Sequence, residues 1–164
     1  MARLAPSRAV RDVPKTIHVE SVFPDGGPIP ARYTCDGEEL SPSIAWRGIP
    51  GDTVEIAVTL EDPDAPRETF VHWMVAGIDS ASLGLEAGLY PHGAVAGVND
   101  FGELGYAGPC PPGGEEAHRY VLTVFACSAG LGLSGGFTAA ELHDAVEGQV
   151  LAIGQLTGIY ERAP

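Results

Sequence analysis

Two short segments of the chain hold residues whose types and spacing could form a polar binding or catalytic site. They are Asp62-Pro63-Asp64-Ala65-Pro66, followed by His72-Trp73, and Gly105-Tyr106-Ala107-Gly108-Pro109-Cys110-Pro111-Pro112, followed by His118-Arg119-Tyr120. Proline fixes its own φ and restricts the residue before it, so both loops should hold their polar groups on rigid backbone. Two aspartates, two histidines and a glycine-bearing loop suffice for a small polar pocket.

Each histidine belongs to a run that is typical of a β-strand. His72 lies in the otherwise apolar run 70–75, where a lone histidine would be a core residue bonded to a backbone carbonyl. The aspartate loop about eight residues upstream can fold back beside it, which favours a site instead. In a strand, His118 and Tyr120 point to the same face of the sheet. Arg119 points to the other face and is expected to form a structural salt bridge. Tyr120 could offer its hydroxyl to the pocket or simply pack in the core.

The proline-rich loop 108–113 has few backbone donors. Proline has no N–H, so only Gly108, Cys110 and Gly113 can donate from this stretch. The Cys110 amide lies between two prolines without a ladder partner, and a rigid amide in a concave loop suits an anion oxygen. A purely structural turn is compatible with the same residues.

These segments resemble the phosphatidylethanolamine-binding protein family, also called Raf-kinase-inhibitor-like proteins, and its short bacterial and archaeal branch in particular. The resemblance extends over residues 16–162 and is also carried by Tyr33-Thr34-Cys35-Asp36-Gly37, Ser41-Pro42, Trp46, Gly97-Val98-Asn99-Asp100-Phe101-Gly102 and Gly158-Ile159-Tyr160-Glu161-Arg162. It implies antiparallel sheets with a few peripheral helices around one anion-binding pocket. It also implies that the loop 33–37 lies near the loop 108–113.

The motifs and the resemblance together predict the ligand contacts. They are Asp62, Asp64, His72, Gly108, Pro109, Cys110, His118 and Tyr120. The resemblance implies that Asp64 faces the pocket, whereas Asp62 either faces the ligand or orients its own loop. A carboxylate alone repels anions, so we expect it to accept a hydrogen bond from a histidine, a ligand amine or a protonated phosphate oxygen. A histidine paired in this way has a raised pKa and favours the cationic form.

Two other chemistries compete with anion binding. Two histidines and two aspartates could hold zinc or iron, but they lack short ligand spacing, and we predict neither metal nor cofactor. An Asp–His pair beside a second histidine could do acid–base work, so a hydrolase using Asp64, His72 and His118 is the alternative function. Because Ser41 and Ser43 lie outside the two motifs and nothing matches Gly-x-Ser-x-Gly, we predict a binding protein and not an enzyme.

The composition indicates one globular, turn-rich, mainly β domain. The 164 residues are 45% hydrophobic and 19% charged, with 22 glycines and 14 prolines. No apolar run approaches the roughly 18 residues of a membrane span. The net charge is −13, and four of the nine basic residues lie in the first 15 positions, so the rest of the chain is strongly acidic. That balance disfavours nucleic acid and anionic membranes as partners.

We therefore predict that the partner is a small oxyanion or a phosphoryl ligand. The resemblance adds inhibition or regulation of a protein kinase or protease, and a homodimer stays open. The first 15 residues lack the apolar stretch of a secretory signal, which predicts a cytoplasmic protein. The three cysteines are odd in number and have no metal spacing, so free thiols are expected, with a Cys35–Cys110 bridge as the alternative and Cys127 in the core.

The hydrophobic pattern divides the chain into an N-terminal arm and one domain. Residues 1–14 are expected to be a flexible arm, with a strap over the body as the alternative, and residues 15–164 form the domain. Strands are predicted over 16–22, 54–61 (half-buried), 70–78 and 119–126 (both covered on two sides), with a short closing strand over 156–160. Thr138 and Glu141 form a capping box for one helix that continues to Val150 with Gly148 inside it.

Overall fold

Two antiparallel sheets face each other, and two helices cover the outer face of the larger sheet. The computed structural model describes residues 5–163. Its elements are η1 (Pro6–Val10, 3-10), β1 (His18–Ser21), η2 (Ala31–Tyr33, 3-10), β2 (Ile44–Arg47), β3 (Glu55–Asp62), β4 (Phe70–Asp79), β5 (Gly84–Leu85), β6 (Val95–Ala96), β7 (His118–Cys127), α1 (Ala139–Val146) and β8 (Val150–Tyr160). Within residues 5–163, no helix combines the length and the apolar character needed to cross a bilayer.

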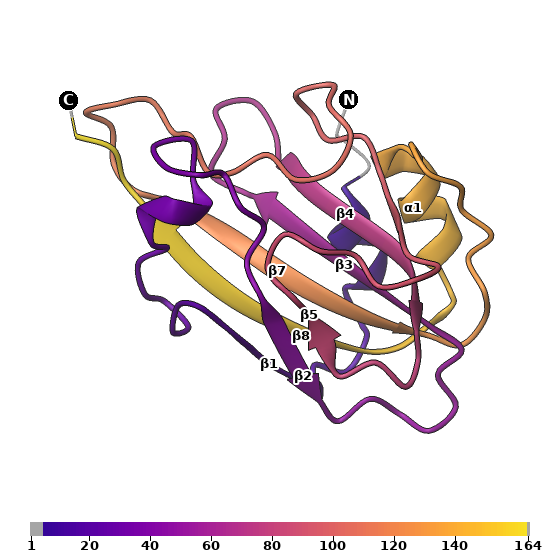
Figure 1. Cartoon of the computed structure of the whole chain (residues 1–164). Coiled ribbons are helices and arrows are strands. Elements are labelled where there is room, and N and C mark those ends of the chain that lie inside the picture. Colours follow the sequence, from indigo (N-terminus) through magenta and orange to yellow (C-terminus); the bar gives the residue numbers. More distant parts are fainter. Residues whose placement is uncertain (1–4, 164) are drawn as a thin grey trace.

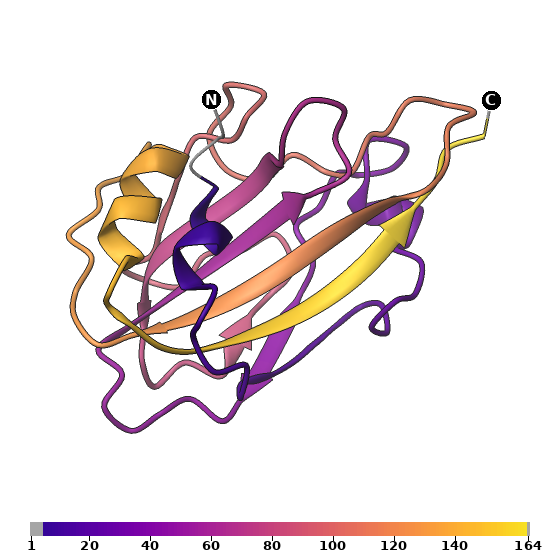
Figure 2. The same ribbon diagram turned by 180° about the vertical axis from the view of Figure 1, so that it is seen from behind.

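The sheets and helices form three layers. The smaller sheet has the order β1-β2-β5 and the larger one β6-β4-β3-β7-β8. In Figure 1 the small sheet lies in front of the large one, and in Figure 2, seen from behind, η1 and α1 lie on the opposite face of the large sheet. The predicted β-sandwich-like domain with few peripheral helices is confirmed.

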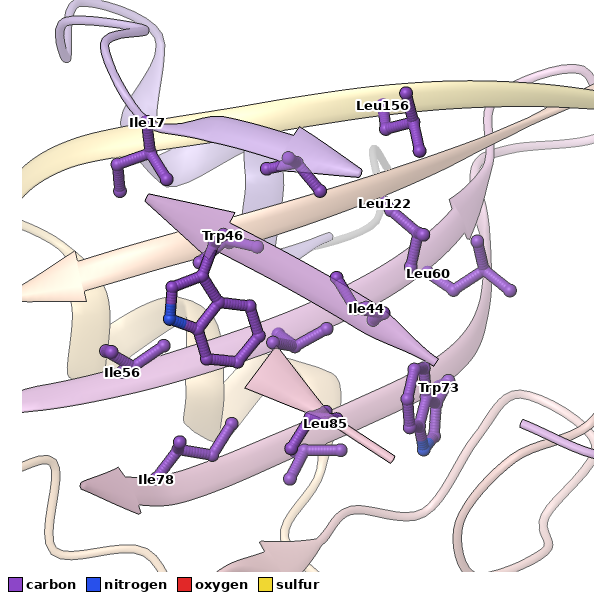
Figure 3. Close-up of a cluster of buried hydrophobic side chains, with 14 of the residues drawn as sticks. Ile17, Ile44, Trp46, Ile56, Leu60, Trp73, Ile78, Leu85, Leu122 and Leu156 are labelled. Carbon is purple, nitrogen blue, oxygen red and sulfur yellow. The ribbon is translucent and has the colours of Figure 1, made fainter. Parts of the chain in front are cut away.

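Two apolar clusters fill the spaces between these layers. The cluster between the sheets includes Trp46 of β2 and Trp73 of β4, which are 3% and 1% exposed. Figure 3 shows their side chains among residues of both sheets, including Ile56, Leu60 and Leu122. A second cluster, with Phe125 and Leu142, lies between the large sheet and α1. Strands β3, β4 and β7 are therefore buried on both faces.

A β-bulge in β4 falls at His72. Leu60 of β3 pairs with Trp73, and the next residue, Glu61, pairs with Val71, so His72 is the extra residue of the ladder. Successive strand residues normally point to opposite faces, and a bulge changes that alternation locally. Trp73 thus packs in the core between the sheets while His72 also reaches that side of the sheet, next to Phe70.

The C-terminal part of the chain differs from its predicted pattern. The capping box at Thr138 and Glu141 is present, but α1 ends at Val146 and Gly148 lies beyond it with φ +77°, a left-handed conformation that favours glycine. Strand β8 then begins at Val150, well before the predicted start at Leu156. Glycines weaken the strand pattern in this part of the sequence. A Cβ at Gly154 would lie 2.3 Å from the Ile17 carbonyl oxygen, so the close approach of the chain at Ile17 requires glycine there.

Residues 5–14 of the predicted arm lie against the helical side of the large sheet, and residues 1–4 fall outside the described residues. Val10 is buried against α1, and Ser7 donates from its backbone N–H (3.1 Å) and its hydroxyl (2.5 Å) to the carboxylate of Glu61. Glu61 is 3% exposed, which corrects the prediction that β3 is half-buried. Burial raises the pKa of Glu61, and the Ser7 hydrogen bonds oppose that rise.

Candidate functional site

Both predicted motifs meet at one cavity, at the end of the large sheet where β3 ends and β4 and β7 begin (upper edge of the sheet in Figure 1). The cavity has a volume of about 160 Å³. It is lined by Asp62, Ala65, Pro66, Phe70, His72, Phe101, Cys110, Pro111, Pro112, His118 and Tyr120. Pockets for drug-sized molecules usually exceed roughly 300 Å³, so this cavity suits a smaller ligand or a head group.

The centre of the site is a buried pair formed by Asp62 and His118. Oδ2 of Asp62 lies 2.8 Å from Nδ1 of His118, and the two side chains are 6% and 10% exposed. Strand pairing produces this contact, because β3 and β7 are adjacent and Glu61 is paired with Val121 at the end of that ladder. The other oxygen of Asp62 accepts the backbone N–H of Asp64 at 2.8 Å, so Asp62 both orients its loop and faces the cavity.

Asp64 is not the histidine partner that was predicted. Its carboxylate accepts three hydrogen bonds from Arg119, one from the backbone N–H and two from the guanidinium, at 2.8 to 3.0 Å. The hydrogen bond from the Arg119 side chain is the largest cause that holds the pKa of Asp64 below its usual range. The alternation of β7 explains the result: His118 points to the cavity, and Arg119 points to solvent, where the loop after Pro63 carries Asp64 toward it. The predicted structural salt bridge of Arg119 is confirmed.

His72 lies in a more apolar wall of the cavity and is 3% exposed. Its Nδ1 lies 2.8 Å from the carbonyl oxygen of Ala107, and its ring contacts Phe70, Phe101 and Tyr120 at centroid distances of 4.9, 5.7 and 5.4 Å. Burial, the largest cause, lowers the pKa of His72 below its usual range. The prediction of a cationic, carboxylate-paired histidine is therefore wrong for His72, because its direct partner is a neutral carbonyl.

The proline-rich loop is fastened to the rest of the molecule by a disulfide. Cys35 and Cys110 are bonded, with their Cα atoms 5.4 Å apart, and Cys127 is the free, buried cysteine among the described residues. The expected proximity of the two loops is confirmed, and the expectation of free thiols is wrong for this pair. Arg162 donates to Cys110 Sγ at 3.7 Å and forms an ion pair with Asp36, so charged groups surround the bridge.

Two predicted contacts from this loop lie away from the cavity lining. The Gly108 N–H donates to Oε1 of Glu39 at 3.2 Å, and the Pro109 carbonyl accepts the Cys35 N–H at 3.2 Å. Both residues hold the loop in place. Cys110, in contrast, does line the cavity as predicted, between the same prolines that remove neighbouring donors.

Tyr120 lines the cavity and is 1% exposed, and burial raises the pKa of its hydroxyl. The two motifs did not predict the aromatic wall made by Phe70 and Phe101, whose rings pack edge to face with their centroids 4.6 Å apart. Asp100 holds Phe101 in place, because its Oδ2 accepts the Val71 N–H at 2.6 Å and its own N–H donates to the Val71 carbonyl. The run 97–102, which contains Phe101, was the part of the sequence that could have indicated this wall.

The molecule also has a larger hollow, which shares no lining residue with this cavity. A groove of about 610 Å³ follows β1 and β8, lined by residues 17–25, Gln155 and Leu156. Its polar groups already have partners: His18 pairs with Glu20 at 2.8 Å, and Asp25 accepts the Thr157 N–H. We assign the site to the smaller cavity, since buried titratable side chains meet there.

Comparisons with known proteins agree with this geometry. Residues 19–161 match the family model described as phosphatidylethanolamine-binding protein. A UPF0098 protein of Methanothermobacter thermautotrophicus is 45% identical over 145 residues, which cover 85% of this chain and 95% of that protein. One from Aquifex aeolicus is 41% identical, with 85% of each chain covered.

Two solved structures share the fold. One is described as a putative phosphatidylethanolamine-binding protein homologue, CT736 of Chlamydia trachomatis, with a TM-score of 0.83 and 33% identity over 90% of this chain and 99% of that one. The other is Escherichia coli YbcL, described as a new member of the mammalian PEBP family, with a TM-score of 0.83 and 30% identity over 89% and 98%. This chain belongs to the phosphatidylethanolamine-binding protein family.

Proposed function

We propose that this protein binds a small oxyanion, namely the phosphoryl group of a small molecule or of a lipid head group, in the cavity between Asp62, His72, His118 and Cys110. The observation that carries the proposal is the buried Asp62–His118 pair at the wall of a cavity of about 160 Å³. A protonated His118 donates from Nδ1 to Asp62 and has Nε2–H to donate to an anion.

Both aspartates of the loop have hydrogen-bond donors of their own, and Glu115, a third carboxylate near His118, is largely exposed at 3.9 Å from Nε2. Asp64 is neutralised by Arg119, and Asp62 accepts hydrogen bonds from both His118 and the Asp64 backbone. Further support comes from the loop, because the Cys110 residue that lines the cavity can donate only through its backbone N–H now that its sulfur is in the disulfide. This set of one carboxylate-paired imidazole, one backbone amide and one buried imidazole supports a binding role.

The same residues favour binding over covalent catalysis. The cavity lining among residues 5–163 contains no serine or threonine, and its cysteine is oxidised. A hydrolase would instead use Asp62 and His118 to activate water. The two functions separate in a screen of phosphoesters, acyl esters and peptides: turnover that disappears in Asp62→Asn would replace the binding proposal. No described residue favours a kinase or protease as partner, so the proposal ends at the small ligand.

Titration calorimetry with inorganic phosphate and with O-phosphoethanolamine tests the proposal. The protein should be purified without phosphate, and His118→Ala should lose most of the affinity. His143→Ala is the matched control, because His143 lies on α1, on the other side of the large sheet. An absence of binding by the wild-type protein across a broad pH range would contradict the proposal.

A further inference from the structure

The hydrogen bonds made by the two histidines fix which ring nitrogen faces the ligand. Nδ1 of His72 lies against a backbone carbonyl, which can only accept, so Nδ1 carries the hydrogen. Nδ1 of His118 lies against the carboxylate of Asp62 and carries a hydrogen for the same reason. In both rings Nε2 is therefore the nitrogen that a molecule in the cavity can use. Nε2 of His118 also has the largely exposed carboxylate of Glu115 3.9 Å away.

The two Nε2 atoms differ in what they offer. His118 touches a carboxylate directly, and its protonated form donates from Nε2. His72 has a carbonyl and three aromatic rings around it, and its burial favours the neutral ring, whose Nε2 is a lone pair that only accepts. The charged and titratable groups that face His72 are Asp62 on β3, Asp100 in the loop after β6, and Tyr120 on β7, with His118 beyond Tyr120.

We propose that His72 makes the cavity selective for oxyanions that carry a proton: its Nε2 accepts a hydrogen bond from a P–OH group, while His118 and the Cys110 amide donate to the unprotonated oxygens. The ligand class is the hydrogen phosphate monoanion or the monoanion of a phosphomonoester. This inference rests on the proposed function and adds the protonation state that the site selects.

The selectivity follows from an unpaired acceptor. Sulfate and phosphodiesters carry no proton near neutral pH, so they would place an oxygen lone pair against the lone pair of Nε2 in a buried site. A buried acceptor left without a donor weakens binding by roughly tenfold or more. A phosphate hydroxyl supplies the missing donor and removes that conflict.

Calorimetry near pH 6.5 with inorganic phosphate, methyl phosphate, dimethyl phosphate and sulfate tests this on the wild-type protein. Phosphate and methyl phosphate should bind at least about tenfold more tightly than dimethyl phosphate and sulfate. On acidification below the folded-state pKa of His72, the ring becomes a donor, and sulfate affinity should rise toward that of phosphate. Equal affinity for sulfate and phosphate near pH 6.5 would overturn the selectivity and leave the proposed function standing. Binding of none of the four would overturn both.

His72→Gln is the variant that tests the residue itself. A glutamine amide can turn either its oxygen or its NH₂ toward the ligand, so the ratio of phosphate to sulfate affinity should fall close to one. His143→Gln makes the same substitution on α1 and should keep the wild-type ratio. Nitrogen-15 NMR of the wild-type imidazoles gives an independent check, since finding the hydrogen of neutral His72 on Nε2 would overturn the inference even if the variant fails to fold.

Discussion

Nδ1 of His118 lies 2.8 Å from the buried carboxylate of Asp62, while the neighbouring Arg119 binds the carboxylate of Asp64 at the surface. His118 and Arg119, which are consecutive in β7, thus bind two different aspartates, Asp62 and Asp64, which are separated by Pro63. The inner pair faces the cavity, and the outer pair fastens the loop Asp62–Pro66 to β7. The two aspartates therefore have separable roles.

The same substitution at the two positions should have different consequences. Asp62→Asn replaces the carboxylate that orients the His118 ring with a weaker acceptor, so phosphate affinity should fall by roughly tenfold and the free energy of unfolding by about 1–3 kcal/mol. Asp64→Asn is the matched control. It breaks a largely exposed ion pair worth at most about 1 kcal/mol and should leave affinity nearly unchanged. Calorimetric titration and urea unfolding of both variants measure this, and equal losses of affinity would contradict the division of roles.

The Cys35–Cys110 bridge should contribute strongly to stability. It closes a loop with a sequence separation of 75 residues, for which chain entropy gives about 4.5 kcal/mol. The double variant Cys35→Ala/Cys110→Ala should lose most of that in urea unfolding and should also bind phosphate more weakly, because Cys110 lines the cavity. Thiol counting on unfolded, unreduced protein should give one free group, Cys127, and three after reduction. Three groups before reduction would show that the bridge does not form.

Glu61 should make the protein less stable as the pH rises through the acidic range. Burial raises its folded-state pKa above the ordinary value of about 4.3, so between that value and the folded-state pKa the unfolded chain loses a proton that the folded protein keeps. Stability falls with pH across this window and is level above it. Glu61→Gln removes this slope, so its stability relative to wild type should increase from pH 4 toward neutral pH. A difference that is constant with pH would count against the assignment.

His72 has the opposite pH dependence. Its folded-state pKa lies below the ordinary value of about 6.5, so on acidification the unfolded chain binds a proton first. The stability contributed by neutral His72 is complete above about pH 6.5 and is lost as the pH falls toward the folded-state pKa. Urea unfolding between pH 5 and 7, without phosphate, should show this loss. His72→Gln should lack the slope, and an unchanged slope in that variant would assign it to another group.

The strands and the helix start that have local signals could be predicted from the sequence. The period-two run after Val54, the apolar runs around Met74 and Leu122, and the capping box at Thr138 each correspond to an element of the structure. Strand β8 was only partly predicted, because Gly154 lacks a side chain for a reason that concerns another segment, the approach of the chain at Ile17. Such a constraint is non-local and leaves no periodic signal.

The site was predicted at the level of its motifs but not of its pairings. Which aspartate meets His118 depends on the register of β3 against β7 and on the path of the loop after Pro63, neither of which spacing reveals. The disulfide was left as an alternative because cysteine number does not report distance. Its presence also removes free thiols as support for the predicted cytoplasmic location.

The bulge adds His72 to β4 without interrupting the structural role of the strand. The residues on either side of it, Val71 and Trp73, keep the partners that an uninterrupted ladder would give them, and each packs in its own apolar cluster. His72 itself has no partner in the β3 ladder, and its carbonyl accepts the N–H of Ala107 at 3.1 Å instead. The strand pairing of β4 and the packing of its two apolar clusters therefore do not depend on residue 72, so the side chain at this position can vary while the sheet keeps its register.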